Sequence, residues 1–231
     1  MGFKSVIILV FGSQGSGKSL YGTMQGYNYY KKGYKVYSNY KLNYPHEQLD
    51  FDRMMECNYN NAVIILDEAH LWGLDARDGM SKQNKGLVKK FIVQIRKQGV
   101  ILLCISQQFR QLDVRLRENA EIVIRCKKYA LINKRIKEVF QSENFDKDVP
   151  IIIETEITNL DTDKTVYKRF IANDYYGLYN TSQVIRMIED QKTNEVKNDT
   201  TKTIKKTNKK KVKKTKTNKS SNKKTKSKKK V

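Results

Sequence analysis

The stretch Gly12-Ser13-Gln14-Gly15-Ser16-Gly17-Lys18-Ser19 decides how the first half of the chain folds. It follows the apolar run Ser5–Phe11, precedes a segment with helical periodicity, and fills every fixed position of the pattern G-x-x-x-x-G-K-[ST]. Small residues let backbone N–H groups surround an anion, and the positive end of the next helix faces the same anion. We expect this loop to bind ATP, with Lys18 on the β- and γ-phosphates and Ser19 on Mg²⁺.

Composition divides the chain into two parts. Of the net charge of +22, most lies in residues 192–231, which contain 18 lysines and only two acids, Glu195 and Asp199. Such a segment cannot bury a core, and we expect it to be a disordered tail. The remaining residues, 1–191, suffice for one domain, which we expect to be a P-loop ATPase domain.

The cysteines and the apolar runs bear on the compartment. Cys57, Cys104 and Cys126 have no C-x-x-C spacing, which is typical of small buried side chains in a reducing environment. No apolar run reaches the length of a membrane helix, and no signal peptide precedes the first strand. We therefore expect a soluble cytoplasmic protein (host cytoplasm if the protein is viral), with a virion or a membrane assembly site as a further location.

Apolar runs alternate with helical segments, which predicts an α/β fold with a mostly parallel sheet flanked by helices. After residue 150, two strand-like segments flank a connection rich in turn-forming residues, which predicts an antiparallel hairpin added at the sheet edge. The expected strands are 4–11, 34–40, 62–66, 100–105 and 121–126, with the hairpin over 151–157 and 165–171. The expected helices are 17–31, 84–98, 110–118 and 181–190, with a polar loop containing a short helix over 41–60 and a glycine-punctuated connection over 72–86.

Acidic residues end the apolar strand 62–66. In a parallel sheet, the carboxylates of Asp67 and Glu68 would face the same crevice as the P-loop. Asp67 is then a candidate to hold Mg²⁺ through water, and Glu68 to orient and deprotonate the attacking water. Together with Ala69-His70, these two residues match the sequence of a helicase motif. We do not interpret the chain as a helicase, because it has no second lobe and no further helicase motif.

Polar residues also end the strand 100–105, in Ser106-Gln107-Gln108. A side chain there can sense the γ-phosphate and hold the lytic water, and Gln107 is the preferred candidate over Gln108. Positive charge on the departing phosphate would come from an arginine of a neighbouring subunit. Arg115 and Arg117 are the main candidates, and Arg77 and Arg96 are others.

In their order, these motifs resemble the FtsK–HerA superfamily of DNA-pumping ATPases, and within it the Zot-like and viral genome-packaging branch. The resemblance rests on Gly12–Ser19, Asp67-Glu68-Ala69-His70, Trp72 with Arg77, Arg96-Lys97-Gln98-Gly99, Ser106-Gln107 and Leu112-Asp113 with Arg117, and on Gly177-Leu178-Tyr179-Asn180-Thr181. It covers about residues 4–190. It implies a RecA-like (ASCE) sheet, a ring of subunits (often six), an arginine supplied in trans and DNA moved through the ring.

One departure concerns the end of the chain. Zot-type phage assembly proteins usually have a transmembrane helix after the ATPase domain, whereas this chain has the lysine tail. Such a tail binds polyanions by counterion release, without reading sequence. The combination favours a DNA translocase of a virus or mobile element, either a genome-packaging or a DNA-transfer motor, with a capsid or portal-type protein as a further partner.

Two other functions stay open. The first is a Zot-type morphogenesis ATPase that works on proteins at a membrane, with the tail as a localising segment. The second is a nucleotide-metabolism kinase, which Glu68 and the absence of an arginine-rich lid disfavour.

Overall fold

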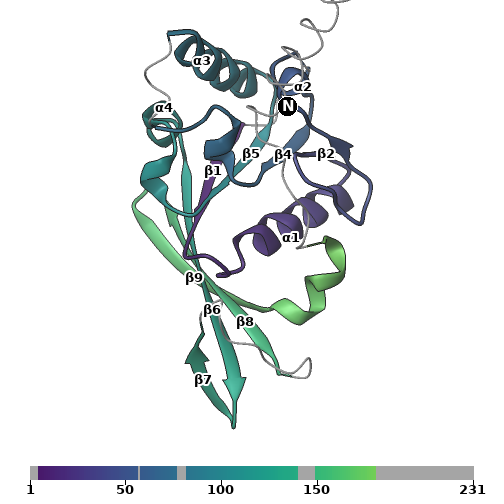
Figure 1. Ribbon diagram of the computed structural model, residues 1–231, viewed down its shortest axis with the longest axis vertical. Coiled ribbons are helices and arrows are strands. Elements are labelled where there is room, and N and C mark those ends of the chain that lie inside the picture. The colour runs from purple at the N-terminus through teal and green to yellow at the C-terminus, as the bar shows by residue number, and fades with distance from the viewer. Residues whose placement is uncertain (1–4, 57, 77–81, 140–148, 181–231) are drawn as a thin grey trace, which may run out of the picture. The chain divides into compact units, whose positions relative to one another are not determined.

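A single mixed sheet organises the part of the chain that the computed structural model describes, which is residues 5–56, 58–76, 82–139 and 149–180 (Figure 1). Within these residues the sheet has nine strands in the order β3-β2-β4-β5-β1-β6-β8-β9, and β7 pairs with β6. The strands are β1 (Val6–Phe11), β2 (Lys35–Ser38), β3 (Glu47–Gln48), β4 (Ala62–Leu66), β5 (Ile101–Ser106), β6 (Ile122–Ile132), β7 (Arg135–Glu138), β8 (Ile151–Asn159) and β9 (Lys164–Ile171).

The strands β3, β2, β4, β5, β1 and β6 run parallel to one another. Strand β5 lies between β1 and β4, with Phe11 opposite Ser106 and Leu66 opposite Cys104. The carboxyl ends of these three strands therefore lie at one edge of the sheet, where open α/β sheets bind ligands. This strand order is that of a RecA-like P-loop NTPase, so the predicted fold class is confirmed.

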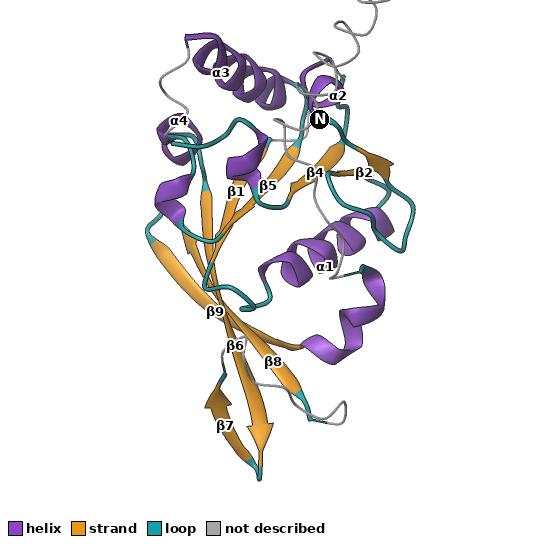
Figure 2. Ribbon diagram, viewed as in Figure 1, coloured by secondary structure: helices purple, strands orange, loops and turns teal. Residues whose placement is uncertain are grey.

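Helices cover both faces of the parallel part of the sheet (Figure 2). They are α1 (Lys18–Lys31), α2 (Phe51–Glu56), α3 (Lys82–Lys97) and α4 (Val114–Glu118), with the 3₁₀ helices η1 (Ala69–Trp72), η3 (Phe109–Gln111) and η4 (Ala172–Leu178). Alternate strand residues point to opposite faces. Ile8 and Val10 accordingly share a core cluster with Leu20 and Met24 of α1, while Ile7 and Leu9 point the other way.

Two glycines let α1 lie close to the sheet. A Cβ at Gly22 would come 2.6 Å from Ile105 Cδ1, and one at Gly26 would come 2.4 Å from Ile65 Cδ1 and 2.5 Å from the Tyr44 hydroxyl. At distances this short the facing Ile or Tyr side chain would have to shift to admit a methyl group. The close packing places the start of α1, and with it the P-loop, directly over the ends of the central strands.

Strand β6 is longer than the sequence predicts. It continues past the expected end at Cys126 to Ile132 and turns back through the unpredicted strand β7. On its other side it pairs antiparallel with β8, which pairs with β9, so the predicted hairpin is confirmed. The apolar alternation ends near Cys126 because the rest of β6 is mostly exposed or half-buried. The periodicity signal therefore fades there, although the backbone pairing continues.

Several further differences concern loops and ends. The segment 41–60 does contain a short helix, α2, but it also buries Leu42, Tyr44, Leu49, Met54 and Tyr59, so it is part of the core. The expected helix 110–118 is divided into η3 and α4. Helix α3 starts at Lys82 and ends at Lys97, before Gly99, whose φ is +66°.

Other expectations concern cysteines, membrane spans and the C-terminal part of the chain. Cys104 and Cys126 are free and buried, as predicted. Among the described helices, none has the length and hydropathy to cross a bilayer. Cys57, Arg77, the expected helix 181–190 and the tail 192–231 lie outside the described residues.

Replacing Gly26 with leucine should destabilise the protein by about 1–3 kcal/mol, because the new side chain overlaps Ile65 and Tyr44 in a packed core. Helix propensity alone favours leucine over glycine and would change stability in the opposite direction. Equilibrium unfolding in urea measures the difference. Asn28→Leu, on the exposed side of the same helix, is the matched control and should stay within about 0.5 kcal/mol of the unmodified chain. Equal stability of the two variants would contradict close packing at Gly26.

Candidate functional site

The loop Gly12–Ser19 connects β1 to α1. A Cβ at Gly12 would come 2.5 Å from the backbone oxygen of Cys126, so only glycine fits beside β6. Gly17 precedes the helix with a left-handed φ of +88°, and no side chain caps the N-terminus of α1. The first N–H groups of α1 and the loop backbone therefore form the kind of concave, positively polarised surface that binds anions.

Lys18 lies over this loop instead of extending into solvent. Its ammonium donates a hydrogen bond of 2.9 Å to the backbone oxygen of Ser13, and the residue is buried. Burial lowers the pKa of Lys18, while the charges of Glu68 and Asp67 act to raise it. The Ser16 hydroxyl is also buried, and among the described residues it has no hydrogen-bond partner. The loop thus holds a buried cation and an unused hydroxyl.

Asp67 follows β4 and is held by its neighbours. The side chain of Asn39, just after β2, accepts a hydrogen bond from the Asp67 N–H and donates one to the Asp67 C=O, each 2.8 Å long. Burial raises the pKa of the Asp67 carboxyl, although a hydrogen bond from Ser19 acts to lower it. The carboxylate and the Ser19 hydroxyl are therefore direct neighbours at the start of α1.

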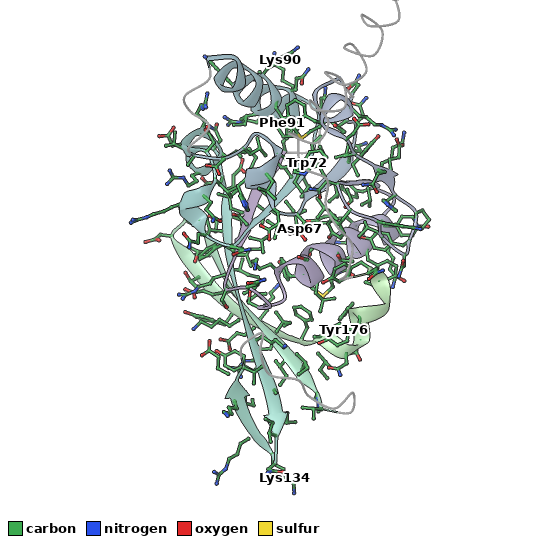
Figure 3. All side chains as sticks on the ribbon, in the orientation of Figure 1. Asp67, Trp72, Lys90, Phe91, Lys134 and Tyr176 are labelled. Carbon is green, nitrogen blue, oxygen red and sulfur yellow. The ribbon has the colours of Figure 1, made fainter. Side chains whose placement is uncertain are left out.

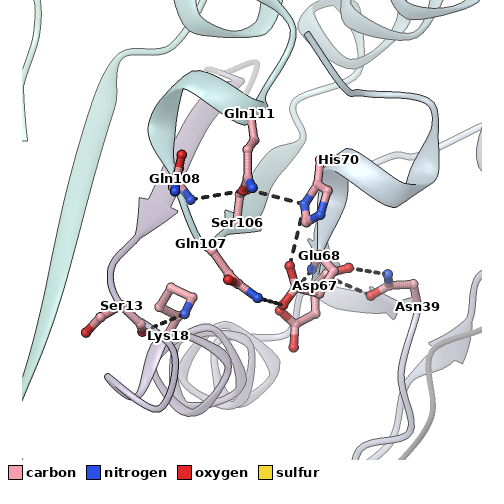
Figure 4. A network of polar contacts seen from close by, with 10 residues as sticks. All are labelled: Ser13, Lys18, Asn39, Asp67, Glu68, His70, Ser106, Gln107, Gln108 and Gln111. Atoms are coloured by element: carbon pink, nitrogen blue, oxygen red, sulfur yellow. Dashed lines mark hydrogen bonds and ion pairs between the residues drawn. The ribbon is translucent and has the colours of Figure 1, made fainter. Parts of the chain in front are cut away.

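Glu68 occupies a left-handed backbone conformation, with φ +46° and ψ +47°, which is uncommon for a residue with a side chain. Its Oε1 accepts a hydrogen bond of 3.3 Å from Gln107 Nε2, and its Oε2 lies 3.5 Å from His70 Nδ1 (Figure 4). Gln107 and His70 thus approach different oxygens of one carboxylate, at the crevice where the P-loop ends.

The two adjacent glutamines after β5 have different environments. Gln107 reaches Glu68, whereas Gln108 takes part in a capping box with Gln111 at the start of η3. Ser106 Oγ lies 3.0 Å from Gln111 Oε1 and 3.3 Å from His70 Nδ1. Of the two glutamines weighed from the sequence, the structure therefore places only Gln107 against Glu68.

The predicted arginines lie on α4 and on neighbouring elements. Arg115 pairs with the buried carboxylate of Asp113 through two hydrogen bonds of 2.8 and 2.6 Å. Arg117 donates to the Leu112 oxygen at 3.0 Å, and its guanidinium lies 5.5 Å from the centre of the Phe109 ring. Arg96 donates to Asn119 at 2.8 Å, and Arg77 is not described.

The contacts of some residues in the site were not predicted from the sequence. Asn39 carries no motif signal, because its role depends on β2 lying beside β4. His70 belongs to the Asp67-Glu68-Ala69-His70 spelling, but sequence reasoning assigned it no contact. Gln111 could be found only from the capping spacing after Gln108.

Comparisons with known proteins identify the family and similar folds. Residues 40–184 match the model of the zonular occludens toxin (Zot) family. The N-terminal domain of zonular occludens toxin from Neisseria meningitidis superposes with a TM-score of 0.50 at 20% identity, over 78% of this chain and 100% of that domain. The match covers more than half of the chain, and the chain belongs to the Zot family.

Other solved structures are less similar. The genome packaging NTPase B204 of Sulfolobus turreted icosahedral virus 2, in complex with sulfate, gives a TM-score of 0.45 at 11% identity, over 71% of this chain and 95% of that one. A DnaB-like replicative helicase gives a TM-score of 0.49 at 11% identity, over 77% of this chain and 59% of that one. No curated protein matches the sequence.

Replacing Asn39 with alanine should destabilise the protein, because the Asp67 N–H and C=O would lose their partner in a buried place. Each unsatisfied buried group costs about 1–3 kcal/mol. Urea unfolding measures the loss. Asn43→Ala is the matched control, since Asn43 also donates to a backbone oxygen, that of Gly177, but in an exposed position. If both variants lose the same small amount of stability, Asn39 does not hold Asp67.

Proposed function

We propose that this protein is a Mg²⁺-dependent ATPase that moves DNA, either packaging a genome or transferring DNA for a virus or mobile element. One observation carries the nucleotide part of the proposal. Lys18, Asp67, Glu68 and Gln107, from three different strand ends, are brought to one crevice beside the anion-binding loop. The motor part rests on the family resemblance and on the lysine tail.

The triphosphate would lie on the loop Gly12–Ser19. Its phosphates would accept hydrogen bonds from the backbone N–H groups and from Ser16 Oγ, which has no partner within the described part of the chain. Lys18 would exchange the Ser13 oxygen for the β- and γ-phosphates. A polyanion at this place compensates the burial that lowers the pKa of Lys18.

Two oxygen-bearing side chains fit Mg²⁺. The Ser19 hydroxyl and the Asp67 carboxylate are hydrogen-bonded to each other, and burial disfavours the charge on Asp67 unless a cation is near. Among the described residues, no group of three or more His, Cys, Asp or Glu side chains could hold a metal. The ion would therefore complete its coordination with nucleotide phosphates and water, as Mg²⁺ commonly does. When bound, it neutralises charge on the β- and γ-phosphates.

The chain's own residues then account for hydrolysis. Gln107 and Glu68 would hold a water molecule in line with the γ-phosphorus. The water oxygen attacks phosphorus, its proton passes to the Glu68 carboxylate, and the bond to the β–γ bridging oxygen breaks to release ADP and phosphate. The hydrogen bond between Gln107 and Glu68 already places their side chains side by side.

An arginine from a neighbouring subunit of a ring would stabilise the departing phosphate. Burial acts to raise the pKa of Asp113, but its hydrogen bonds with Arg115 outweigh this and lower the pKa, so Arg115 has a structural partner. Among the described residues, the Arg117 guanidinium donates to a backbone oxygen and lies over an aromatic ring, and its charge lowers the pKa of Asp113 less than Arg115 does. Arg117 is therefore the preferred candidate of the two.

A second function has its own supporting observation. The outer strand β9 exposes apolar side chains, with Val166 52%, Tyr167 63% and Ile171 47% exposed. Exposed apolar groups on an edge strand favour a protein partner. The alternative is therefore a morphogenesis ATPase of the Zot type that acts on proteins at a membrane.

Lys18→Ala and Glu68→Gln should each reduce phosphate release by at least about 100-fold, because the first removes phosphate charge compensation and the second removes the base. Glu68→Gln should still bind a fluorescent ATP analogue, whereas Lys18→Ala should bind it weakly. Glu47→Gln, the same change on the edge strand β3, is the control and should hydrolyse normally. Normal turnover by Glu68→Gln would remove Glu68 from the mechanism.

Duplex DNA should increase the rate of ATP hydrolysis, and deletion of residues 192–231 should weaken DNA binding and reduce its salt dependence, because the tail binds by counterion release. Phosphate release with and without DNA, together with the oligomer mass, measures both expectations. If no nucleic acid stimulates turnover, the motor function fails while the ATPase stands. Full activity as a monomer would exclude an arginine supplied in trans.

A further inference from the structure

Strands β6 and β7 form an arm, residues 128–138, that extends beyond the helices at the end of the sheet far from α3 (Figure 1). Residues 133–138 are all exposed, and within the described chain β7 pairs only with β6. Leu131 and Ile136 are opposite each other and 36% and 52% exposed. Ala130 is fully buried in the core cluster and Ile132 packs against it, so folding explains the base of the arm but not its exposed end, residues 133–138.

The pairing register determines which side chains of the arm share a face. Opposite residues in an antiparallel pair share a face, and successive residues alternate. Lys137 is opposite Ala130 and Arg135 is opposite Ile132, so these two cations lie on one face together with Lys128. The same face includes the buried Ala130, and its exposed charge is therefore that of Arg135 and Lys137. The other face has the apolar pair Leu131 and Ile136 and the arm's single acid, Glu138.

The tip adds a fourth cation in an unfavourable backbone conformation. Asn133 and Lys134 form the two-residue turn, with φ of +51° and +62°. Turns of this kind strongly prefer glycine at the second position, where an L side chain is strained. Lysine at this position places a charge at the most exposed point of the arm, where Figure 3 labels Lys134.

No carboxylate in the described part of the chain forms an ion pair with Lys128, Lys134, Arg135 or Lys137. Within the described residues, the exposed side chains of Lys134, Arg135 and Lys137 are therefore not neutralised by a carboxylate. Helix α3 is also basic and has no acidic residue. Its Arg96 and Lys97 are in the last turn, where cations are stabilised by the helix dipole, and Arg96 also donates to Asn119. Lys89 and Lys90 are exposed, so α3 is the competing cationic surface that the test must separate from the arm.

Strand β6 also connects the arm to the nucleotide site. Its residue Cys126 provides the backbone oxygen against which Gly12 of the P-loop packs, two residues before the arm begins. A partner bound to the arm would therefore contact the same strand that supports the loop.

We propose that the cationic face of the arm binds the phosphate backbone of duplex DNA. A two-stranded ribbon has the dimensions of the major groove, and lysine and arginine side chains on one face can contact phosphates along its edge. The inference rests on the proposed DNA motor and assigns it a contact surface separate from the tail.

The test compares two triple variants of the full chain. The arm variant is Lys134→Gln, Arg135→Gln and Lys137→Gln. The control is Lys89→Gln, Lys90→Gln and Lys97→Gln on α3, which removes the same charge from exposed positions. Binding of a fluorescent mixed-sequence DNA duplex is titrated at several salt concentrations, and thermal unfolding confirms that both variants fold.

The arm variant should bind at least about tenfold more weakly near 0.1 M salt, and the slope of log K against log salt should fall by about 2–3, or about 0.9 for each lost phosphate contact. The α3 control should stay within about twofold of the unmodified chain. Equal weakening of both variants would overturn the proposal, because it would indicate only general attraction. Weakening of the control alone would also overturn it.

Two further outcomes separate this inference from others. If the unmodified chain binds DNA and the arm variant binds equally well, the arm assignment fails while the motor function stands. If the unmodified chain binds no DNA, the arm assignment and the DNA-motor function both fail, while the ATPase stands. Sedimentation with phosphatidylserine vesicles tests whether the arm binds the phosphates of lipids instead of those of DNA. An arm variant that no longer binds vesicles but still binds DNA would overturn the assignment.

Discussion

The parallel register of β1, β5 and β4 is the constraint on which the rest of the site depends. Because Phe11 is opposite Ser106 and Leu66 is opposite Cys104, the three chain segments that follow these strands leave the sheet at the same level. A shift of one residue would reverse the direction of every side chain on a strand. The register is stabilised by residues buried on both faces of all three strands, so the core of the protein and the geometry of the site have the same origin.

Buried charge is the second common feature of the site. Lys18 and Asp67 are both buried. Burial lowers the pKa of Lys18 and raises that of Asp67, and each shift favours the neutral form of the group. The protein tolerates them because they are close to each other and to hydroxyl and amide groups, including Asn39, which holds the backbone of Asp67. A triphosphate with a divalent cation supplies charge of both signs, so a ligand of this kind would complete the site.

Much of the fold was predictable, because the central strands are continuous apolar runs and the P-loop motif has a known structural context. The hairpin of β8 and β9 was also predicted, from its turn-rich connection. The extension of β6 and the strand β7 were not, since their exposed residues lack a periodic apolar signal. The segment 41–60 was expected to be polar, but its aromatic side chains pack beneath α1 and against β2, as with Tyr44 and Tyr59.

The sequence by itself determined the elements whose chemistry is local: the loop Gly12–Ser19, the acidic end of β4 and the glutamines after β5. Only the tertiary structure decided how these elements meet. It placed Gln107 rather than Gln108 beside Glu68 and brought Asn39 to Asp67. The physical reason is that motifs specify backbone conformation over a few residues, whereas contacts between strand ends depend on strand order, register and the close packing of α1.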